Sequence, residues 1–226
     1  MAKRAQIVIV DEHDAVCAGV ESWLVRPNPG FTLAGSFRRS TEYLRWLATH
    51  RHAVDVVVSE IQEDGHPPDL DRLQELCAAG PPVVVYSRIT ADEVILSCID
   101  FGVRCYIAKS DGGEHLIAAL TLIQEGRSYQ GPRMAAALER VKTVGRLGLS
   151  VREQEVLRAW LRTDSKDDVA AALHISTATV RTHLQRLRAK YEAVGRPAPT
   201  KAALLARAME DGFVGLGDLQ PRQLNG

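Results

Sequence analysis

Apolar residues in the first half of the chain gather in short, β-branched runs that alternate with longer amphipathic segments. The runs cover residues 6–10, 31–36, 54–61, 82–87 and 105–108. The segments between and after them have apolar positions at helical spacing, beginning after residue 12 and then over 41–50, 70–79, 90–101 and 113–126. Strict alternation of strand and helix predicts a doubly wound α/β fold with a parallel five-stranded sheet.

From residue 149 the pattern becomes helical only. Ser150 and Glu153 form a capping box before one amphipathic segment, and Ser165 with Asp168 predicts another. A turn over 174–176 leads to a helix that Ser176 caps, and Thr200 caps a last one ending near Gly212. We therefore expect a small, all-α unit of four helices.

These changes of pattern predict a domain organisation. We expect one domain over 1–128, a linker over 129–148, a helical domain over 149–212 and a tail over 213–226. The glycines in 145–148 mark the more flexible part of the linker.

The helix predicted after Ser176 has two contrasting faces. Its apolar face carries Val180, Leu184, Leu187 and Tyr191, at spacings of four, three and four. Its opposite face carries small and polar residues flanked by basic ones: Ala178, Arg181, Thr182, Gln185, Arg186 and Ala189. A helix with this front fits a DNA major groove.

Charge is distributed unevenly although the whole chain of 226 residues has formal net charge zero. Residues 147–226 hold 12 Lys and Arg against 9 Asp and Glu, which gives +3, so residues 1–146 carry −3. Between Thr177 and Lys201 six basic residues accompany one acid, Glu192. This local excess of positive charge is the footprint expected for phosphate contact.

Cysteines and hydropathy indicate the compartment. The four cysteines are scattered without a CxxC pair, which favours reduced thiols in a cytoplasmic protein. No apolar run reaches the length of a membrane span, and no signal-peptide segment begins the chain. We expect no membrane partner.

Chemistry-bearing residues follow the predicted strands. Asp11 and Glu12 end the first strand and Glu60 ends the third, while Ser87 and Lys109 end the fourth and fifth. In a parallel sheet these carboxyl ends share one crevice, so acids, a hydroxyl and a lysine should converge there.

The helical region resembles the helix-turn-helix domain of LuxR/NarL-type transcription regulators. Three stretches carry the resemblance, LSVREQEVL (149–157), SKDDVA (165–170) and TVRTH (179–183), and it continues to about Ala208. It implies binding to double-stranded DNA, base-reading by Arg181, Thr182 and Gln185, and a homodimer that contacts through the last helix. Residues placed for DNA phosphates are Lys166, Ser176, Thr179, Arg186 and Lys190.

The first half resembles the receiver domain of two-component response regulators. Asp11, Glu12, Ser87 and Lys109 match its pocket, and Tyr106 matches its switch aromatic. In that family the acidic pair holds Mg²⁺, and an aspartate that ends the third strand accepts a phosphoryl group. Here Glu60 stands at that position. The same oxygen ligands suggest an Mg²⁺ site at Asp11, Glu12 and Glu60.

The extra methylene of Glu60 displaces its carboxylate from the place of an aspartate. An offset of about 1 Å costs on the order of a hundredfold in such transfers, so we predict absent or very weak phosphorylation at this site. Three interpretations stay open. Glu60 acts as a fixed negative charge toward Ser87 and Lys109, or pairs with Lys109 and freezes the pocket, or marks a site without a signalling role.

The sequence thus predicts a non-enzymatic transcription regulator of response-regulator type with a degenerate receiver. If the pocket is frozen, control passes to a small ligand, a protein partner or protein abundance. One alternative is an interaction module that titrates another regulator. Another is a phosphotransfer enzyme, which Asp11-Glu12-His13 disfavours because haloacid-dehalogenase-type phosphatases need Asp-x-Asp.

Overall fold

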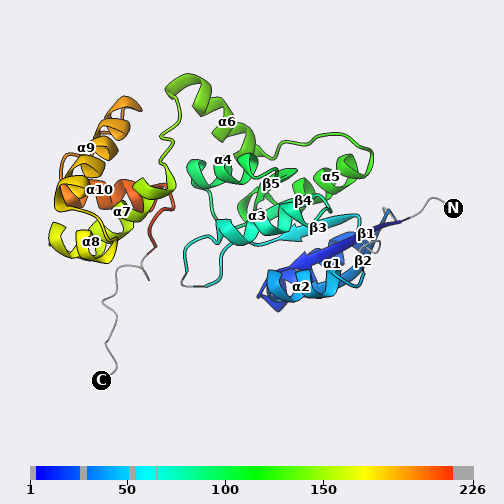
Figure 1. Ribbon diagram of the computed structural model, residues 1–226. Helices are drawn as coiled ribbons and strands as arrows, with labels where there is room; N and C mark the ends of the chain where they lie inside the picture. Colours follow the sequence, from blue (N-terminus) through cyan, green and yellow to red (C-terminus); the bar gives the residue numbers. More distant parts are fainter. Residues whose placement is uncertain (1–3, 26–29, 51–53, 65, 216–226) are drawn as a thin grey trace. The chain divides into compact units, whose positions relative to one another are not determined.

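Five parallel strands form the centre of the first of two units in the computed structural model, which describes residues 4–25, 30–50, 54–64 and 66–215 (Figure 1). The strand order is β2-β1-β3-β4-β5. The strands are β1 (Ala5–Val10), β2 (Phe31–Phe37), β3 (Val56–Ser59), β4 (Val83–Ser87) and β5 (Cys105–Ala108). The predicted doubly wound parallel sheet is confirmed.

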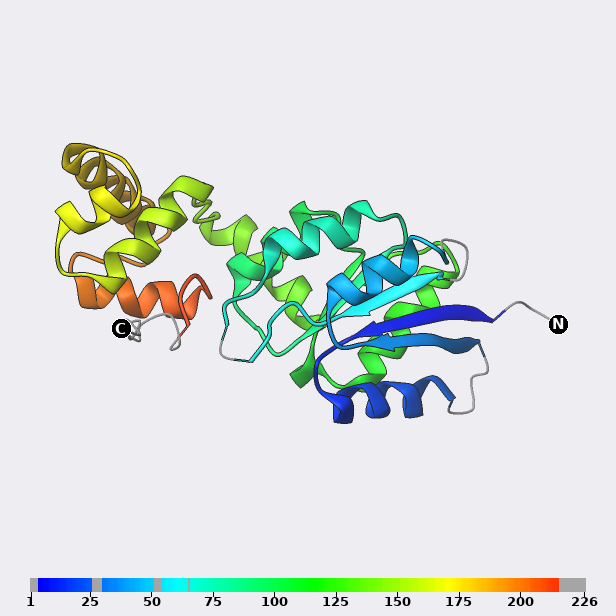
Figure 2. The ribbon, with the colours of Figure 1, turned by 60° about the horizontal axis from the view of Figure 1, so that its bottom comes forward.

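Helices cover both faces of this sheet (Figure 2). On one face lie α1 (Asp14–Val25) and α5 (Gly113–Gln124), and on the other lie α2 (Ser40–Leu47), α3 (Leu70–Ala78) and α4 (Asp92–Asp100). Because neither face meets water, Ile7, Val8 and Ile9 are all at most 1% exposed, and β1 needs no polar alternation.

The first unit is longer than the sequence predicts. It comprises the chain up to Glu63 and from Pro68 to Leu138, while Asp64–Pro67 and the chain from Glu139 onward make up the second unit. Helix α6 (Pro132–Val144) begins in the expected linker, but its Met134 and Ala137 are buried in the first core. The first part of the predicted 129–148 linker is therefore packed structure.

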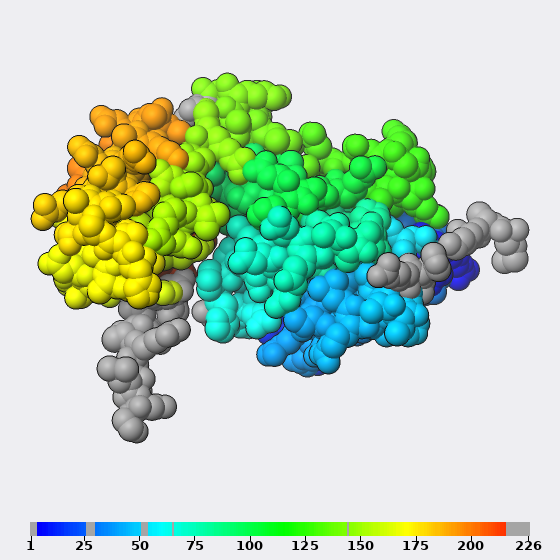
Figure 3. All heavy atoms as spheres, viewed as in Figure 1, coloured from blue at the N-terminus to red at the C-terminus, as the bar shows by residue number. Residues whose placement is uncertain are grey.

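Four helices of the described part lie wholly within the second unit, as predicted: α7 (Val151–Arg162), α8 (Lys166–Ala172), α9 (Thr177–Ala193) and α10 (Lys201–Glu210). In the space-filling view, α8 (yellow) and α9 (yellow to orange) lie side by side (Figure 3). Phe213 and Val214 are buried in this core, so the tail begins later than residue 213; its part over 216–226 lies outside the described residues.

Helix ends in the second unit follow local chemistry. Ser150 and Glu153 form the predicted capping box, and Ser165, Ser176 and Thr200 cap the next three helices. One detail is wrong: Asp168 accepts a hydrogen bond from the Thr163 hydroxyl at 2.9 Å and does not close a box with Ser165. No helix in the described residues combines the length and apolarity that crossing a bilayer demands.

The turn between α8 and α9 contains a strained residue. His174 has φ of 52°, the left-handed region that favours glycine. The amide of Ile175 donates to Ala170 O at 3.0 Å, and the amide of His174 donates to Ala171 O at 3.3 Å. These two bonds form a Schellman motif, which ends α8 and positions the start of α9.

Candidate functional site

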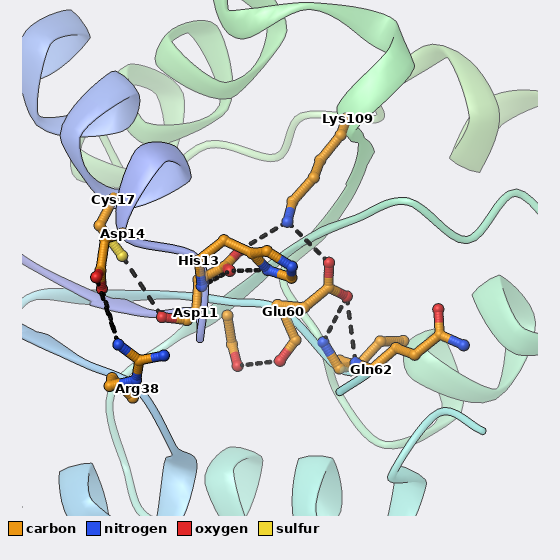
Figure 4. Close-up of polar contacts among 10 residues, drawn as sticks. Asp11, His13, Asp14, Cys17, Arg38, Glu60, Gln62 and Lys109 are labelled. Carbon is orange, nitrogen blue, oxygen red and sulfur yellow. Dashed lines mark hydrogen bonds and ion pairs between the residues drawn. The ribbon is translucent and has the colours of Figure 1, made fainter. Parts of the chain in front are cut away.

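The side chain of Lys109 joins two acids at the carboxyl edge of the sheet (Figure 4). Its Nζ lies 2.6 Å from Asp11 Oδ2 and 2.9 Å from Glu60 Oε2. Asp11 follows β1, Glu60 follows β3 and Lys109 follows β5, so the parallel topology brings them together as expected. Their side chains are only 3%, 5% and 14% exposed, which places the three charges out of water.

Glu60 also bonds to its own backbone neighbours. Its Oε1 accepts from the Ile61 amide at 2.8 Å and from the Gln62 amide at 3.2 Å (Figure 4). The other oxygen faces Lys109, so both carboxylate oxygens are engaged. This geometry corresponds to the interpretation in which Glu60 pairs with Lys109.

Further bonds fix Asp11 and the protonation of Lys109. Asp11 Oδ1 accepts from the His13 amide at 2.9 Å and lies 3.0 Å from His13 Nδ1, which agrees with a loop-shaping role for this histidine. Burial by itself lowers the pKa of Lys109, but Asp11 and Glu60 together outweigh it, so its pKa lies above the ordinary value. The ammonium is charged.

Two aromatic residues that the sequence pattern does not predict lie beside Lys109 and each other. The Lys109 ammonium lies 5.7 Å from the centre of the Tyr86 ring, within cation–π range. Trp23 meets Tyr86 edge-on at 6.3 Å, and a Cβ on Gly113 would lie 2.7 Å from the Trp23 ring. Tyr86 directly precedes the predicted pocket residue Ser87, which is the one sequence signal for it.

The side chains of Ser87, in β4, and Tyr106, in β5, form hydrogen bonds with the loop between β4 and α4. The Ile89 amide donates to Ser87 Oγ at 3.2 Å, and the Tyr106 hydroxyl donates to Ile89 O at 2.8 Å. Both side chains are fully buried, and burial raises the pKa of Tyr106 far above its usual range. Both residues thus hold the loop between β4 and α4.

The residues expected to hold Mg²⁺ do not suit a divalent cation in this arrangement. Asp11 Oδ2 and Glu60 Oε2 both face the Lys109 ammonium, which already supplies positive charge between them. Asp11, Glu60 and the half-buried Glu12 all line one cavity of about 50 Å³. That volume is far below the roughly 300 Å³ of a typical small-molecule site, so it counts against a small organic ligand at this edge.

The exposed face of α9 carries the predicted base-reading residues. Arg181, Thr182 and Gln185 are exposed, whereas Val180, Leu184, Leu187 and Tyr191 are buried against the second core. Arg186 is exposed as well. Arg181 and Arg186 have no ion-pair partner within the described part of the chain, so their charges are available to an external anion.

The other residues expected at DNA phosphates differ in their surroundings. Ser176 is exposed and its Oγ caps α9, 2.8 Å from Thr179 Oγ1. The ammonium of Lys166, at the start of α8, lies 5.6 Å from the Trp160 ring centre, while Lys201 approaches the same ring at 5.0 Å. The indole thus holds Lys166 near the N-terminus of α8.

Lys190, expected at a DNA phosphate, forms hydrogen bonds inside the unit. Its Nζ donates to Gly148 O and to Glu153 Oε2, both at 2.7 Å. Burial raises the pKa of Glu153, but Lys190 and Ser150 outweigh that effect and hold its pKa below the ordinary value. Lys190 therefore ties α9 to the start of α7, a tertiary contact that helical periodicity does not reveal.

The fold and the charged edge of its sheet define a receiver-like α/β unit joined in one chain to a helix-turn-helix unit. Residues 147–202 match the family described as bacterial regulatory proteins, luxR family. The response regulator protein VraR of Staphylococcus epidermidis is 25% identical over 209 residues, which cover 89% of this chain and 95% of VraR.

Solved structures agree with this assignment. RcsB of Salmonella enterica serovar Typhimurium, bound to the promoter P1flhDC with the phosphomimetic BeF₃⁻, aligns with TM-score 0.66 and 18% identity over 94% of this chain and 100% of RcsB. The response regulator ChrA of a heme-sensing two-component system is 28% identical over 94% of this chain and 100% of its own, with TM-score 0.50. The chain is homologous to response regulators and carries a LuxR-type helix-turn-helix domain.

Proposed function

We propose that this chain is a sequence-specific, DNA-binding transcription regulator whose receiver works without phosphorylation at position 60. The observation that carries the proposal is the buried bridge of Lys109 between Asp11 and Glu60. The bridge neutralises Lys109 with a charge that is part of the chain. In this proposal the Glu60 carboxylate, one methylene longer than an aspartate, presents its negative charge to Lys109 without phosphorylation.

The geometry of Glu60 disfavours phosphoryl transfer. An attacking carboxylate needs a free oxygen in line with the donor. One oxygen of Glu60 accepts two amide hydrogen bonds and the other pairs with Lys109. With Asp11 paired to the same ammonium, the proposed mechanism uses no Mg²⁺ and no other cofactor. The chain then acts by binding and not as an enzyme.

DNA contact is assigned to the exposed face of α9. Arg181 would bond guanine, Gln185 would favour adenine and the Thr182 methyl would touch thymine. Ser176, Thr179, Arg186 and Lys166 would contact phosphates and set the register. We assign no direct phosphate contact to Lys190, whose ammonium already bonds within the unit.

The working form is proposed to be a cytoplasmic homodimer on an inverted repeat. The receiver would occupy residues up to about 138 and the DNA-binding domain would begin near 147, where the luxR-family match starts. The cavity at the charged edge of the sheet, about 50 Å³, leaves little room for a small ligand there, so a protein partner or the amount of the chain is the favoured input at this edge.

Selection of bound DNA from a random pool tests this function. Unphosphorylated full-length protein and the fragment from Leu147 onward would be run side by side. We expect the full-length protein to enrich an inverted repeat and an Arg181→Ala variant to lose preference at one base pair of each half-site. If the full-length protein enriches nothing while the fragment does, the receiver inhibits and the proposed control is wrong. If neither enriches a sequence, the chain is an interaction module.

A further inference from the structure

The loop between β4 and α4 connects the receiver pocket to α6. Its first residue follows Ser87, whose hydroxyl accepts from the Ile89 amide at 3.2 Å. Ile89 O accepts from the Tyr106 hydroxyl at 2.8 Å, and the next carbonyl, Thr90 O, accepts from Arg133 Nη2 at 2.7 Å. Two consecutive carbonyls are thereby held by two different elements, β5 and α6.

The start of α6 is seated closely against the same strand. A Cβ on Gly131 would lie 2.5 Å from the carbonyl oxygen of Tyr106, so only glycine allows this approach. Pro132 at the first helical position suits a helix start, and Met134 and Ala137 are buried in the receiver core. The first turns of α6 therefore form part of the receiver, and the helix then runs on into the chain of the second unit.

Arg133 makes a polar contact between α6 and this loop. It is half-buried, and its charge lies near enough to Tyr106 to oppose, weakly, the rise that burial causes in the pKa of that phenol. A guanidinium bonded to a backbone carbonyl is a charge-assisted hydrogen bond, which is stronger than a neutral one. A displacement of the loop on its pocket side would break this bond.

We propose that Arg133 is a positioning residue that couples the Ser87 side of the receiver pocket to α6, the helix leading to the DNA-binding unit. This coupling rests on the proposed function, because its role is to transmit the state of the receiver pocket to the DNA-binding unit. It requires only that the loop can adopt two arrangements, and that both the pocket and α6 shift the equilibrium between them. In the arrangement described here the loop is bonded on both sides and α6 is held.

Amide hydrogen exchange on the full chain tests the coupling, because it reports local opening segment by segment. The variants are Ser87→Ala, Arg133→Ala and the two combined, with Lys142→Ala as control. Lys142 lies on α6 and pairs with Glu139 of the same helix, so this control removes the same charge without touching the loop.

Ser87→Ala should speed exchange of the amides of residues 134–138 about fivefold, as expected for one neutral hydrogen bond. Arg133→Ala should speed it about tenfold, as expected for one charged hydrogen bond. The combined variant should exchange no faster there than Arg133→Ala alone, because in this proposal the loop acts on α6 through Arg133. Lys142→Ala should leave these amides unchanged.

Two results would overturn the coupling. One is faster exchange in the loop of Ser87→Ala with unchanged exchange in α6. The other is a combined effect equal to the product of the single effects, which describes a merely structural Arg133. DNA affinity of the unaltered chain is measured beside these. Its absence would remove the proposed function and leave the exchange result standing, so the two failures are distinguishable.

Discussion

Lys109 and Arg181 both carry a positive charge at a functional position, but their surroundings are opposite. The side chain of Lys109 is 14% exposed and lies between two carboxylates. Arg181 is exposed and has no ion-pair partner in the described residues. A buried charge needs a partner within the fold, whereas an exposed one costs little and stays available to another molecule. The chain thus keeps the pocket charge internal and leaves the α9 charges available to another molecule.

Removing the buried charge of Lys109 should have the largest effect on stability. Lys109→Met leaves Asp11 and Glu60 buried without their cation and should cost the first unit about 3–5 kcal/mol. Urea unfolding would measure this by Trp23 and Trp46 fluorescence in a Trp160→Phe background. Lys142→Met, which removes an exposed charge, is the matched control and should change stability by less than about 0.5 kcal/mol. Equal losses in both variants would contradict the buried bridge.

Removing the exposed charges should leave stability unchanged and alter DNA binding. Arg181→Ala should cost about 1–3 kcal/mol of discrimination at one base pair. Arg186→Ala should weaken binding to all sequences alike and lower the salt slope by about one. Competition binding against single-base variants, repeated at several salt concentrations, separates the two roles. Uniform loss on every sequence for both variants would refute the division.

Lys190 sharpens the comparison because it lies on α9 but is bonded internally. Lys190→Ala should lower the thermal stability of the fragment from Leu147 onward, since Gly148 O loses this donor and the buried Glu153 loses its cation. Its salt slope for DNA binding should match that of the unaltered fragment. A reduced slope with unchanged stability would instead restore Lys190 as a phosphate contact.

A substitution at His174, in the turn between α8 and α9, should raise the stability of the second unit. His174→Gly relieves the left-handed backbone and should stabilise the fragment by about 0.5–1 kcal/mol. Ala172→Gly, two residues earlier and still helical, should destabilise it by a similar amount. Thermal unfolding compares them. The same sign of change in both would show that backbone strain at residue 174 is not the cause.

The ion pair of Lys190 with Glu153 should also produce a small dependence of stability on pH. The pKa of Glu153 is lower in the folded unit than in the unfolded chain, so its contribution is present above the unfolded value and is lost as pH falls through the folded one. Burial raises the pKa of Asp211, which acts in the opposite direction: stability falls as pH rises from its ordinary to its raised value. The urea unfolding midpoint, measured as a function of pH, should rise less steeply on the acid side in Glu153→Gln. It should rise more steeply there in Asp211→Asn.

How much the sequence predicts depends on how local the cause is. β-branched runs, helical spacing and capping residues act within a few positions, which is why the strands, the helices of the second unit and the cap at Ser165 were predicted correctly. The meeting of Asp11, Glu60 and Lys109 also followed, because parallel topology alone places strand ends together.

Contacts between distant elements were not predictable in this way. Tyr86 beside Lys109, Lys190 bonded to Glu153 and Arg133 bonded to Thr90 O each join segments whose separation in space no local pattern specifies. The packing of Met134 and Ala137 into the receiver core has the same cause, because a helix in a linker has the same periodicity as one that docks.

One measurement tests the central claim that the receiver, with Lys109 bridged to Glu60, works without phosphorylation. DNA affinity of the full-length chain for its selected site would be measured before and after incubation with Mg²⁺ and a small phosphodonor, beside a Glu60→Asp variant. We predict that the unaltered chain binds before treatment, is unchanged by it and gains no mass, whereas Glu60→Asp becomes phosphorylated. Binding by the unaltered chain only after treatment, with phosphorylation at Glu60, would contradict the account.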